Sequence, residues 1–309
     1  MLKRIEEALA SIPYPATPEG LYEPISYTMS LGGKRLRPAL TLYAYSLYRS
    51  DVETAMPVAL AIELYHNHTL LHDDVMDQAD VRRGRPTVHR KWDGNTAILS
   101  GDTMLIMAVR QLLQLPPSVS LPPVLELLTR TMQEICEGQQ MDMNFERQEN
   151  VREEDYLEMI RKKTSVLLAC ALRAGAMVAG APEEDAEMLY RFGESLGLAF
   201  QLQDDYLDCY GNPEVFGKET GGDIRCGKKT YLLINALQRA DAVQRSALQS
   251  RAVPEVLEVY RQLDIPRRCL ERIEALFDEA RTLYEALPVP AERKRPLWEL
   301  AEQMLHRQK

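Results

Sequence analysis

The sequence predicts an all-α protein, and three observations favour this class. Apolar residues recur with helical periodicity along almost the whole chain of 309 residues, no segment shows a convincing alternating strand pattern, and prolines and glycines interrupt the helical stretches at short intervals. The length alone would allow two domains, but no linker divides the chain. We therefore expect one all-α domain over residues 1–309.

The expected helices follow one another between proline and glycine breaks. Pro24 precedes a helix that ends at Gly32 and Gly33, and Pro38 and Pro57 each stand in the first turn of a later helix, where a backbone N–H is not needed. Long helices are then expected over 124–146, 155–180 and 187–211, loops over 115–123, 180–185 and 214–230, and shorter helices with proline-containing turns in the remainder.

Composition and charge exclude several function classes. The net charge of −9 argues against a nucleic-acid partner, whose binding surface is usually basic. The five cysteines form no C-x-x-C pair, and such an odd, scattered set is typical of reduced thiols in a cytosolic protein. The N-terminus is charged and amphipathic rather than a signal peptide, and no uncharged apolar run approaches the roughly 18 residues of a membrane span. We expect a cytoplasmic protein without a transmembrane segment.

The motif D-D-x-x-D occurs twice, at 73–77 and 204–208, each time near the C-terminal end of a largely apolar helix. On a helix the first and last aspartates of each motif lie on one face, and the middle one is rotated by about 100°. Like charges at this spacing repel, so the arrangement needs a cation. Two such pairs facing each other across a cavity would suit Mg²⁺. The candidate ligands are Asp73, Asp74, Asp77, Asp204, Asp205 and Asp208.

Other readings of these residues are weaker. A single motif could be a solvated helix end, but two copies embedded in apolar sequence disfavour that reading. An EF-hand loop would need alternating ligands and a central glycine. Glu63 and His66 form one E-x-x-H, whereas a di-iron bundle needs two copies. His68 and His72 could bind zinc with an aspartate, but no further nitrogen or sulfur ligand is evident.

Three basic clusters stand out in this acidic chain. Each alone could be a solvated surface patch. Taken with the paired aspartates, they indicate two anionic polyphosphate groups, one held through metal bridges plus lysines and the other directly by Arg and Lys. The clusters are Lys34, Arg35 and Arg37 beside a helix start, Arg82 and Arg83 after the first aspartate motif, and the dispersed set Lys163, Lys218, Lys228 and Lys229.

Together these motifs resemble one family, the trans-isoprenyl diphosphate synthases (polyprenyl synthetases). The resemblance covers nearly the whole chain, in the family's order and spacing. It rests on GGKRLRP, HDDVMDQADVRRGRPTVH, GQQMD, KKT, FQLQDDYLDCYG and GKETGGDIRCGKKT. It implies an orthogonal helical bundle of the isoprenoid synthase type around a deep central cavity, usually in a homodimer. The implied reaction is the Mg²⁺-dependent condensation of isopentenyl diphosphate with allylic diphosphates.

The resemblance also implies residue roles. Three Mg²⁺ ions would hold the allylic diphosphate, with Asp73, Asp77 and Asp204 as direct ligands and Asp74, Asp205 and Asp208 ligating directly or through water. The positions that bind the allylic diphosphate are matched by Arg82, Lys163 and Lys218, and the pocket for isopentenyl diphosphate by Lys34, Arg37, His66 and Arg83. Two polar groups near the reacting carbons are matched by Thr164 and Gln201. A lysine that closes over the site is matched by Lys228.

In this family the growing prenyl tail runs beside the helix that carries the first aspartate motif, and side chains of that helix limit the product length. Thr69, His68 and Tyr65 lie four, five and eight residues before Asp73 and can block the growing tail. Many relatives that make farnesyl diphosphate have an aromatic ring at the fifth position, and long-chain producers have alanine. His68 departs from both and Thr69 is small, which favours C20 geranylgeranyl diphosphate, with C15 farnesyl diphosphate as the alternative.

Two further classes remain as rivals. Class I terpene cyclases share the first aspartate motif, but they usually carry a different second motif and need no isopentenyl diphosphate pocket. Non-catalytic subunits of heteromeric synthases tend to lose one aspartate motif, and this chain keeps both.

Overall fold

The computed structural model describes residues 1–211 and 220–305, which form two compact units. Unit 1 comprises Met1–Leu128 and Ala171–Ala186, and unit 2 comprises Thr129–Cys170 and Glu187–Lys309. The boundaries fall inside helices α7 (Leu121–Phe145), α9 (Val166–Ala179) and α10 (Glu183–Tyr210). A single domain over 1–309 remains a prediction.

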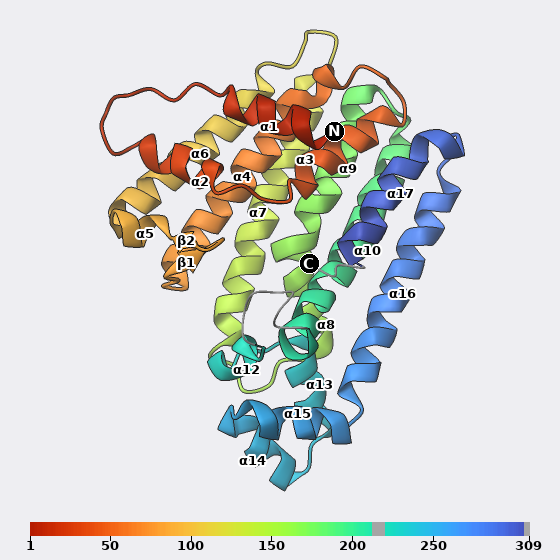
Figure 1. The fold of residues 1–309 in the computed structure, drawn as a ribbon. Helices are drawn as coiled ribbons and strands as arrows, with labels where there is room; N and C mark the ends of the chain where they lie inside the picture. Colours follow the sequence, from red (N-terminus) through yellow and green to blue (C-terminus); the bar gives the residue numbers. More distant parts are fainter. Residues whose placement is uncertain (212–219, 306–309) are drawn as a thin grey trace. The chain divides into compact units, whose positions relative to one another are not determined.

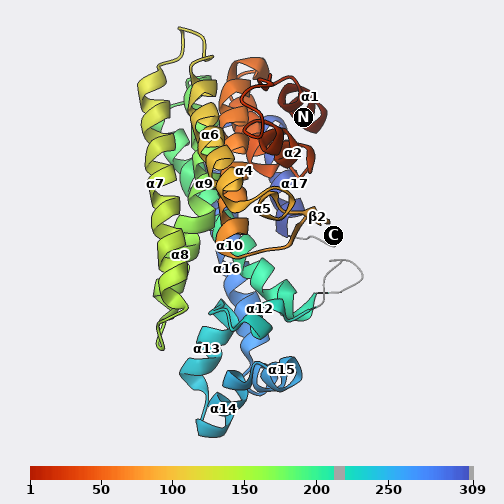
Figure 2. The ribbon, with the colours of Figure 1, turned by 90° about the vertical axis from the view of Figure 1, so that its left-hand side faces the viewer.

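Unit 1 is built around one buried helix, α4 (Met56–Met76), which packs against α3 (Leu36–Ser46) and α6 (Gly94–Leu112) (Figures 1 and 2). Apolar residues lie on every side of its first three turns, so this helix can be stable only when it is surrounded by other helices. Its neighbours are α1 (Leu2–Ala10), α2 (Glu23–Ser30), α3 (Leu36–Ser46), a 3₁₀ turn at Val52–Ala55, the hairpin of β1 (Val81–Arg82) and β2 (Arg85–Pro86), α5 (Val88–Lys91) and α6 (Gly94–Leu112).

The helices of unit 2 include a π-helical turn. Between α8 (Glu153–Ile160) and α9 lies a π-helical turn, Arg161–Ser165, a feature often found at functional sites. A Cβ at Gly138 of α7 would lie 2.4 Å from the backbone nitrogen of Lys163, so only glycine allows α7 to approach this turn so closely. The other helices are α12 (Gly222–Cys226), α13 (Tyr231–Arg239), α14 (Ala242–Ser250), α15 (Val253–Gln262), α16 (Ile265–Ala286) and α17 (Ala291–Leu305).

The all-α prediction is confirmed, with local corrections. Arg82 and Arg85 pair in a short antiparallel hairpin that the sequence reading missed, because two-residue strands carry no periodicity. The segment 214–230 was expected as a loop, but its described part contains α12. The helix expected over 155–180 is interrupted by the π-helical turn. None of the described helices combines the length and apolar character needed to cross a bilayer.

Candidate active site

The first aspartate motif lies at the C-terminal end of α4, where the helix dipole disfavours negative charge. Asp77 caps the C-terminus of the helix directly after Met76, and Asp74 is buried. The hairpin turns the chain back so that Arg82 Nε donates to both Asp74 carboxylate oxygens at 2.8 Å. Arg82 therefore supplies a positive charge to the middle aspartate of the motif.

A cavity of about 460 Å³ in unit 1 collects four of the residues expected to bind a diphosphate. Lys34, Arg37, His66 and Arg83 all line it, although they come from two helices, the connection between α2 and α3, and the hairpin. We call this cavity the cationic pocket. Its lining carries more positive than negative charge in an acidic protein, so an anionic ligand would suit it.

Arg35, which lies between the pocket residues Lys34 and Arg37, is bonded within the protein. Its side chain is 1% exposed, Nη1 donates to Glu63 at 2.7 Å, and Nε donates to Glu6 at 2.9 Å. Its backbone adopts the left-handed conformation, with φ of 48°. The charge of Arg35 is neutralised internally, and its fixed position holds the neighbouring segment against α4.

His66 is held in the neutral form by its surroundings. Burial lowers its pKa well below the usual value, and the charges of Arg37 and Arg83 lower it further. Arg37 Nη1 lies 3.1 Å from His66 Nε2, and a neutral ring can accept this hydrogen bond. Burial also lowers the pKa of Arg83, with the charge of Arg35 acting in the same direction. A bound anion would relieve this crowding of positive charge.

The residues expected to limit product length share one region of α4. Tyr65 is fully buried, and the ring of His68 lies 5.5 Å from it and 4.5 Å from the ring of His72. Both histidines contact backbone carbonyls of α6: His68 Nδ1 lies 2.9 Å from Gly101 O, and His72 Nε2 lies 3.1 Å from Ile98 O. These nitrogens act as donors there, so the structure does not favour the zinc alternative. Thr69 donates to the His66 carbonyl at 2.8 Å.

The second aspartate motif lies inside α10, in unit 2. Asp205 is almost fully buried and accepts hydrogen bonds from the hydroxyl of Tyr156 and, at 3.2 Å, from the backbone N–H of Tyr231. Burial raises the pKa of Asp205 to about 6, and the Tyr156 hydrogen bond and the charge of Lys228 oppose that rise. Asp208 accepts from the backbone N–H of Asp223 at 3.0 Å.

The π-helical turn carries two further predicted residues. Lys163 Nζ lies 2.6 Å from Asp142 of α7. Thr164 donates to Gln201 at 3.1 Å, and Gln201 Nε2 lies 3.4 Å from Asp205. The structure thus connects Thr164, Gln201 and Asp205 in one hydrogen-bonded chain.

Sequence reasoning assigned no role to Asp142, Tyr156 or Asp223, which hold predicted residues in place. Asp142 and Asp223 could have been found, because they lie in the motifs GQQMD and GKETGGDIRCGKKT, whereas Tyr156 lies in none of the quoted motifs. Lys228 lines a second cavity, in unit 2. Lys218 lies outside the described residues.

The donor set of the aspartate motifs fits magnesium. Within the described ranges, no three His, Cys, Asp or Glu side chains converge on one metal position. Mg²⁺ does not require such a cage, because it keeps several waters and shares one or two carboxylates with substrate phosphates. Asp73 and Asp77 in one motif and Asp204 and Asp208 in the other are the outer residues that could supply those carboxylates. The middle residues, Asp74 and Asp205, accept hydrogen bonds from Arg82 and Tyr156.

Comparisons with known proteins agree with one another. A family model described as polyprenyl synthetase matches residues 18–261. The geranylgeranyl diphosphate synthase of Methanosarcina mazei is 45% identical over 223 residues, which cover 72% of this chain and 69% of that protein. A crystal structure of a geranylgeranyl pyrophosphate synthase matches with a TM-score of 0.89 and 41% identity over 100% of this chain and 97% of that one. The geranylgeranyl pyrophosphate synthetase from Pyrococcus horikoshii matches with a TM-score of 0.92 and 32% identity over 99% and 96%.

Proposed function

The chain belongs to the polyprenyl synthetase family and is a prenyltransferase, and we propose that it condenses isopentenyl diphosphate head to tail with allylic diphosphates to make geranylgeranyl diphosphate. The observation that carries the proposal is the cationic pocket, which gathers Lys34, Arg37, His66 and Arg83 in a chain that matches the family over most of its length. Relatives named geranylgeranyl diphosphate synthase support the C20 product. C15 farnesyl diphosphate is the alternative.

Under this proposal the two diphosphates are bound differently. The cationic pocket binds isopentenyl diphosphate directly, with Arg37 and Arg83 as forked donors and neutral His66 as a further hydrogen-bonding group. Arg82, Lys163, Lys218 and Lys228 bind the allylic diphosphate, and the carboxylates of both D-D-x-x-D motifs bind three Mg²⁺ ions beside it. Since Asp74 now pairs with Arg82 and Asp142 with Lys163, these carboxylates keep both cations oriented.

The reaction then follows from charge. When bound, Mg²⁺ supplies positive charge that stabilises the departing diphosphate as the allylic C–O bond breaks. Arg82 and Lys163 add to that stabilisation. The double bond of isopentenyl diphosphate attacks the allylic cation, a new C–C bond forms, and the released diphosphate takes the proton that is lost. Thr164 and Gln201 lie near the reacting carbons in this proposal, and their mutual hydrogen bond fixes their orientation.

His68 and Tyr65 limit product length under this proposal. The hydrogen bond from His68 to the Gly101 carbonyl fixes the imidazole, and Tyr65 lies below it along α4. His68→Ala or Tyr65→Ala is expected to lengthen the product. An unchanged product distribution in both variants would remove this part of the proposal.

A homodimer is also part of the proposal. Leu99, Ile106 and Leu113 repeat every seven residues along α6 and its end, and they are 59%, 61% and 69% exposed. Such a stripe suits a helix that packs against a second copy. Ile106→Glu is expected to yield monomers in light scattering. The cytoplasmic location stays a prediction.

The deciding experiment incubates the purified protein with Mg²⁺, isopentenyl diphosphate and the C5, C10 or C15 allylic primer, and resolves the products by mass spectrometry. A C20 product that consumes the C15 primer supports the proposal. Accumulation of C15 with that primer unused would make the protein a farnesyl diphosphate synthase. Absence of condensation with all primers would favour a non-catalytic subunit, and cyclic hydrocarbons would favour a cyclase.

A further inference from the structure

Unit 2 contains a second cavity, and Lys228 is the one residue of its described lining to which the proposed reaction assigns a role. Its volume is about 640 Å³, within the range of small-molecule sites. Its walls come from the connection between α7 and α8, the segment 227–230, and helices α13, α14 and α15. We call it the α13–α15 cavity.

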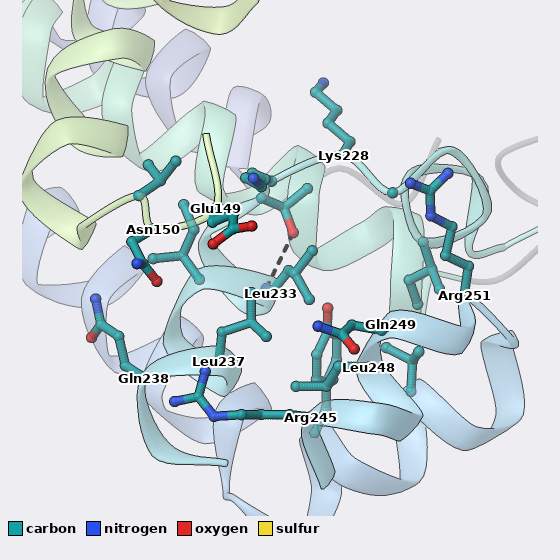
Figure 3. A pocket seen from close by; sticks show the side chains of 18 of the residues that line it. Glu149, Asn150, Lys228, Leu233, Leu237, Gln238, Arg245, Leu248, Gln249 and Arg251 are labelled. Carbon is teal, nitrogen blue, oxygen red and sulfur yellow. Dashed lines mark hydrogen bonds between the residues drawn. The ribbon is translucent and has the colours of Figure 1, made fainter. Parts of the chain in front are cut away.

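The middle of the α13–α15 cavity is aliphatic. Figure 3 shows Leu233 and Leu237 of α13 and Leu248 of α14 in the centre, surrounded by the polar side chains of Arg245, Gln238 and Asn150. Of the described residues that line the cavity, Tyr260 is the one aromatic, and it is 1% exposed. A flat nucleobase would find no exposed aromatic face there, whereas an alkyl or prenyl chain would find a matching surface.

The lining of the cavity is cationic in an acidic chain. Among the described lining residues there are five cations and one carboxylate, that of Glu149; the cations are Lys228, Lys229, Arg245, Arg251 and Arg152. Arg152 is already paired with Asp155. No carboxylate in residues 1–211 and 220–305 forms an ion pair with Lys229, Arg245 or Arg251. Arg245 Nε donates to the Ala240 carbonyl at 3.2 Å, which fixes its position, and its other nitrogens can bind an anion.

We propose that the α13–α15 cavity binds an amphiphilic anion, a phosphate ester of a medium-length alkyl or prenyl chain. The chain lies on Leu233, Leu237 and Leu248, and the phosphate binds Arg245 together with Lys229 or Arg251. A prenyl phosphate would be a product-like effector of the enzyme, and an alkyl phosphate would represent a lipid metabolite.

One wall of the cavity is formed by the start of α13, whose backbone also donates a hydrogen bond to the second aspartate motif. Thr230 lines the cavity and caps α13 by accepting from Leu233 N–H at 3.4 Å. The next backbone N–H, that of Tyr231, donates to Asp205. A ligand that displaces Leu233 would therefore move the donor of Asp205. We expect it to lower kcat without changing KM for isopentenyl diphosphate, an effect that rests on the proposed function, whereas the binding itself does not.

Binding is tested by calorimetry on the full chain, with dodecyl phosphate below its critical micelle concentration and with farnesyl monophosphate as the second probe. Leu237→Glu places a carboxylate in the cavity and is expected to weaken binding more than tenfold, and Arg245→Gln about tenfold. Val243→Glu adds the same charge on exposed α14 surface outside the cavity and should bind like the unmodified chain. Thermal unfolding checks that each variant is folded.

The results distinguish binding in the α13–α15 cavity from binding in the cationic pocket, and a prenyl ligand from an alkyl ligand. Preference for farnesyl monophosphate supports a prenyl effector, and equal affinity supports any amphiphilic phosphate. If neither probe binds, or if Leu237→Glu binds both normally, the proposal is overturned. Loss of binding in Arg83→Ala instead of Leu237→Glu would place the probe in the cationic pocket and also overturn it. These results hold even if the protein condenses no substrate. With turnover, dodecyl phosphate should inhibit the unmodified chain and spare Leu237→Glu.

Discussion

The two D-D-x-x-D motifs have the same pattern and opposite local chemistry. In unit 1 the middle aspartate, Asp74, is held by an arginine, and the nearby cavity crowds positive charges. In unit 2 the middle aspartate, Asp205, is held by neutral donors, the Tyr156 hydroxyl and the Tyr231 N–H. The first arrangement balances charge with charge, and the second buries a charge among fixed dipoles.

Two copies of one motif can therefore place their outer aspartates at the same helix positions while their middle aspartates have different hydrogen-bond partners. An Arg–carboxylate pair can exchange its partner for a phosphate, because guanidinium binds both groups with the same fork. Fixed hydroxyl and backbone donors have no such exchange available, so they orient Asp205 and its neighbours along α10. The predictions below test this distinction, beginning with the largest expected effect.

The first prediction separates outer from middle aspartates. Asp73→Asn and Asp204→Asn remove direct metal ligands in the proposed mechanism, and kcat/KM with Mg²⁺ should fall by about 10³-fold or more. Asp74→Asn leaves an acceptor for Arg82 and should cost roughly tenfold to a hundredfold, mainly in KM for the allylic substrate. Steady-state kinetics measures all three. Equal losses for Asp73→Asn and Asp74→Asn would end the distinction.

The second prediction concerns the buried ion pair of unit 1. Arg35→Met leaves the carboxylate of Glu63 buried without its cation and should lower the free energy of unfolding by about 3–5 kcal/mol. The double variant Arg35→Met, Glu63→Leu should regain most of that loss, because both charges are removed. Urea unfolding measures the stability. A double variant no more stable than the single one would show that the pair does not act as a unit.

The third prediction uses the opposite pH responses of the two regions. Burial, and then the charge of His72, lower the pKa of His68 to about 4, with Gly101 and Asp102 opposing. At pH values between about 4 and 6.5, His68 binds a proton in the unfolded chain but not in the folded chain. Stability from this residue is therefore lost as pH falls, by up to about 3 kcal/mol.

Asp205 acts in the reverse direction. Its pKa rises from 3.8 to about 6, so the folded chain binds the extra proton in this window and stability is lost as pH rises. Without metal, His68→Gln should make the protein relatively more stable at pH 5 than at pH 7, and Asp205→Asn should do the opposite. Urea unfolding at both pH values measures this. Shifts of the same sign in both variants would contradict the assignment.

The sequence predicted which residues gather in unit 1 better than it predicted how they are held. Helical periodicity predicted both aspartate motifs on helices, and the resemblance to the polyprenyl synthetases grouped the four residues of the cationic pocket. The sequence could not show that Arg35, which also lines that pocket, is paired with Glu6 and Glu63, because a left-handed residue in a short connection leaves no periodic signal. Nor could it pair Asp205 with Tyr156, which lies 49 residues earlier, because such contacts depend on how the helices pack.

The smallest expected effect tests the fixed donors of unit 2. Tyr156→Phe keeps the buried ring and removes one hydrogen bond to Asp205, which retains the Tyr231 N–H, so the free energy of unfolding should fall by about 1–2 kcal/mol. This is less than the loss in Arg35→Met, because no charge is left without its counter-charge. The turnover rate should fall by roughly tenfold as Asp205 loosens, and Tyr231→Phe, which keeps the backbone donor, is the matched control. If Tyr156→Phe destabilised the protein as much as Arg35→Met does, neutral donors would hold Asp205 as strongly as an ion pair holds Arg35, and the two regions would no longer differ in kind.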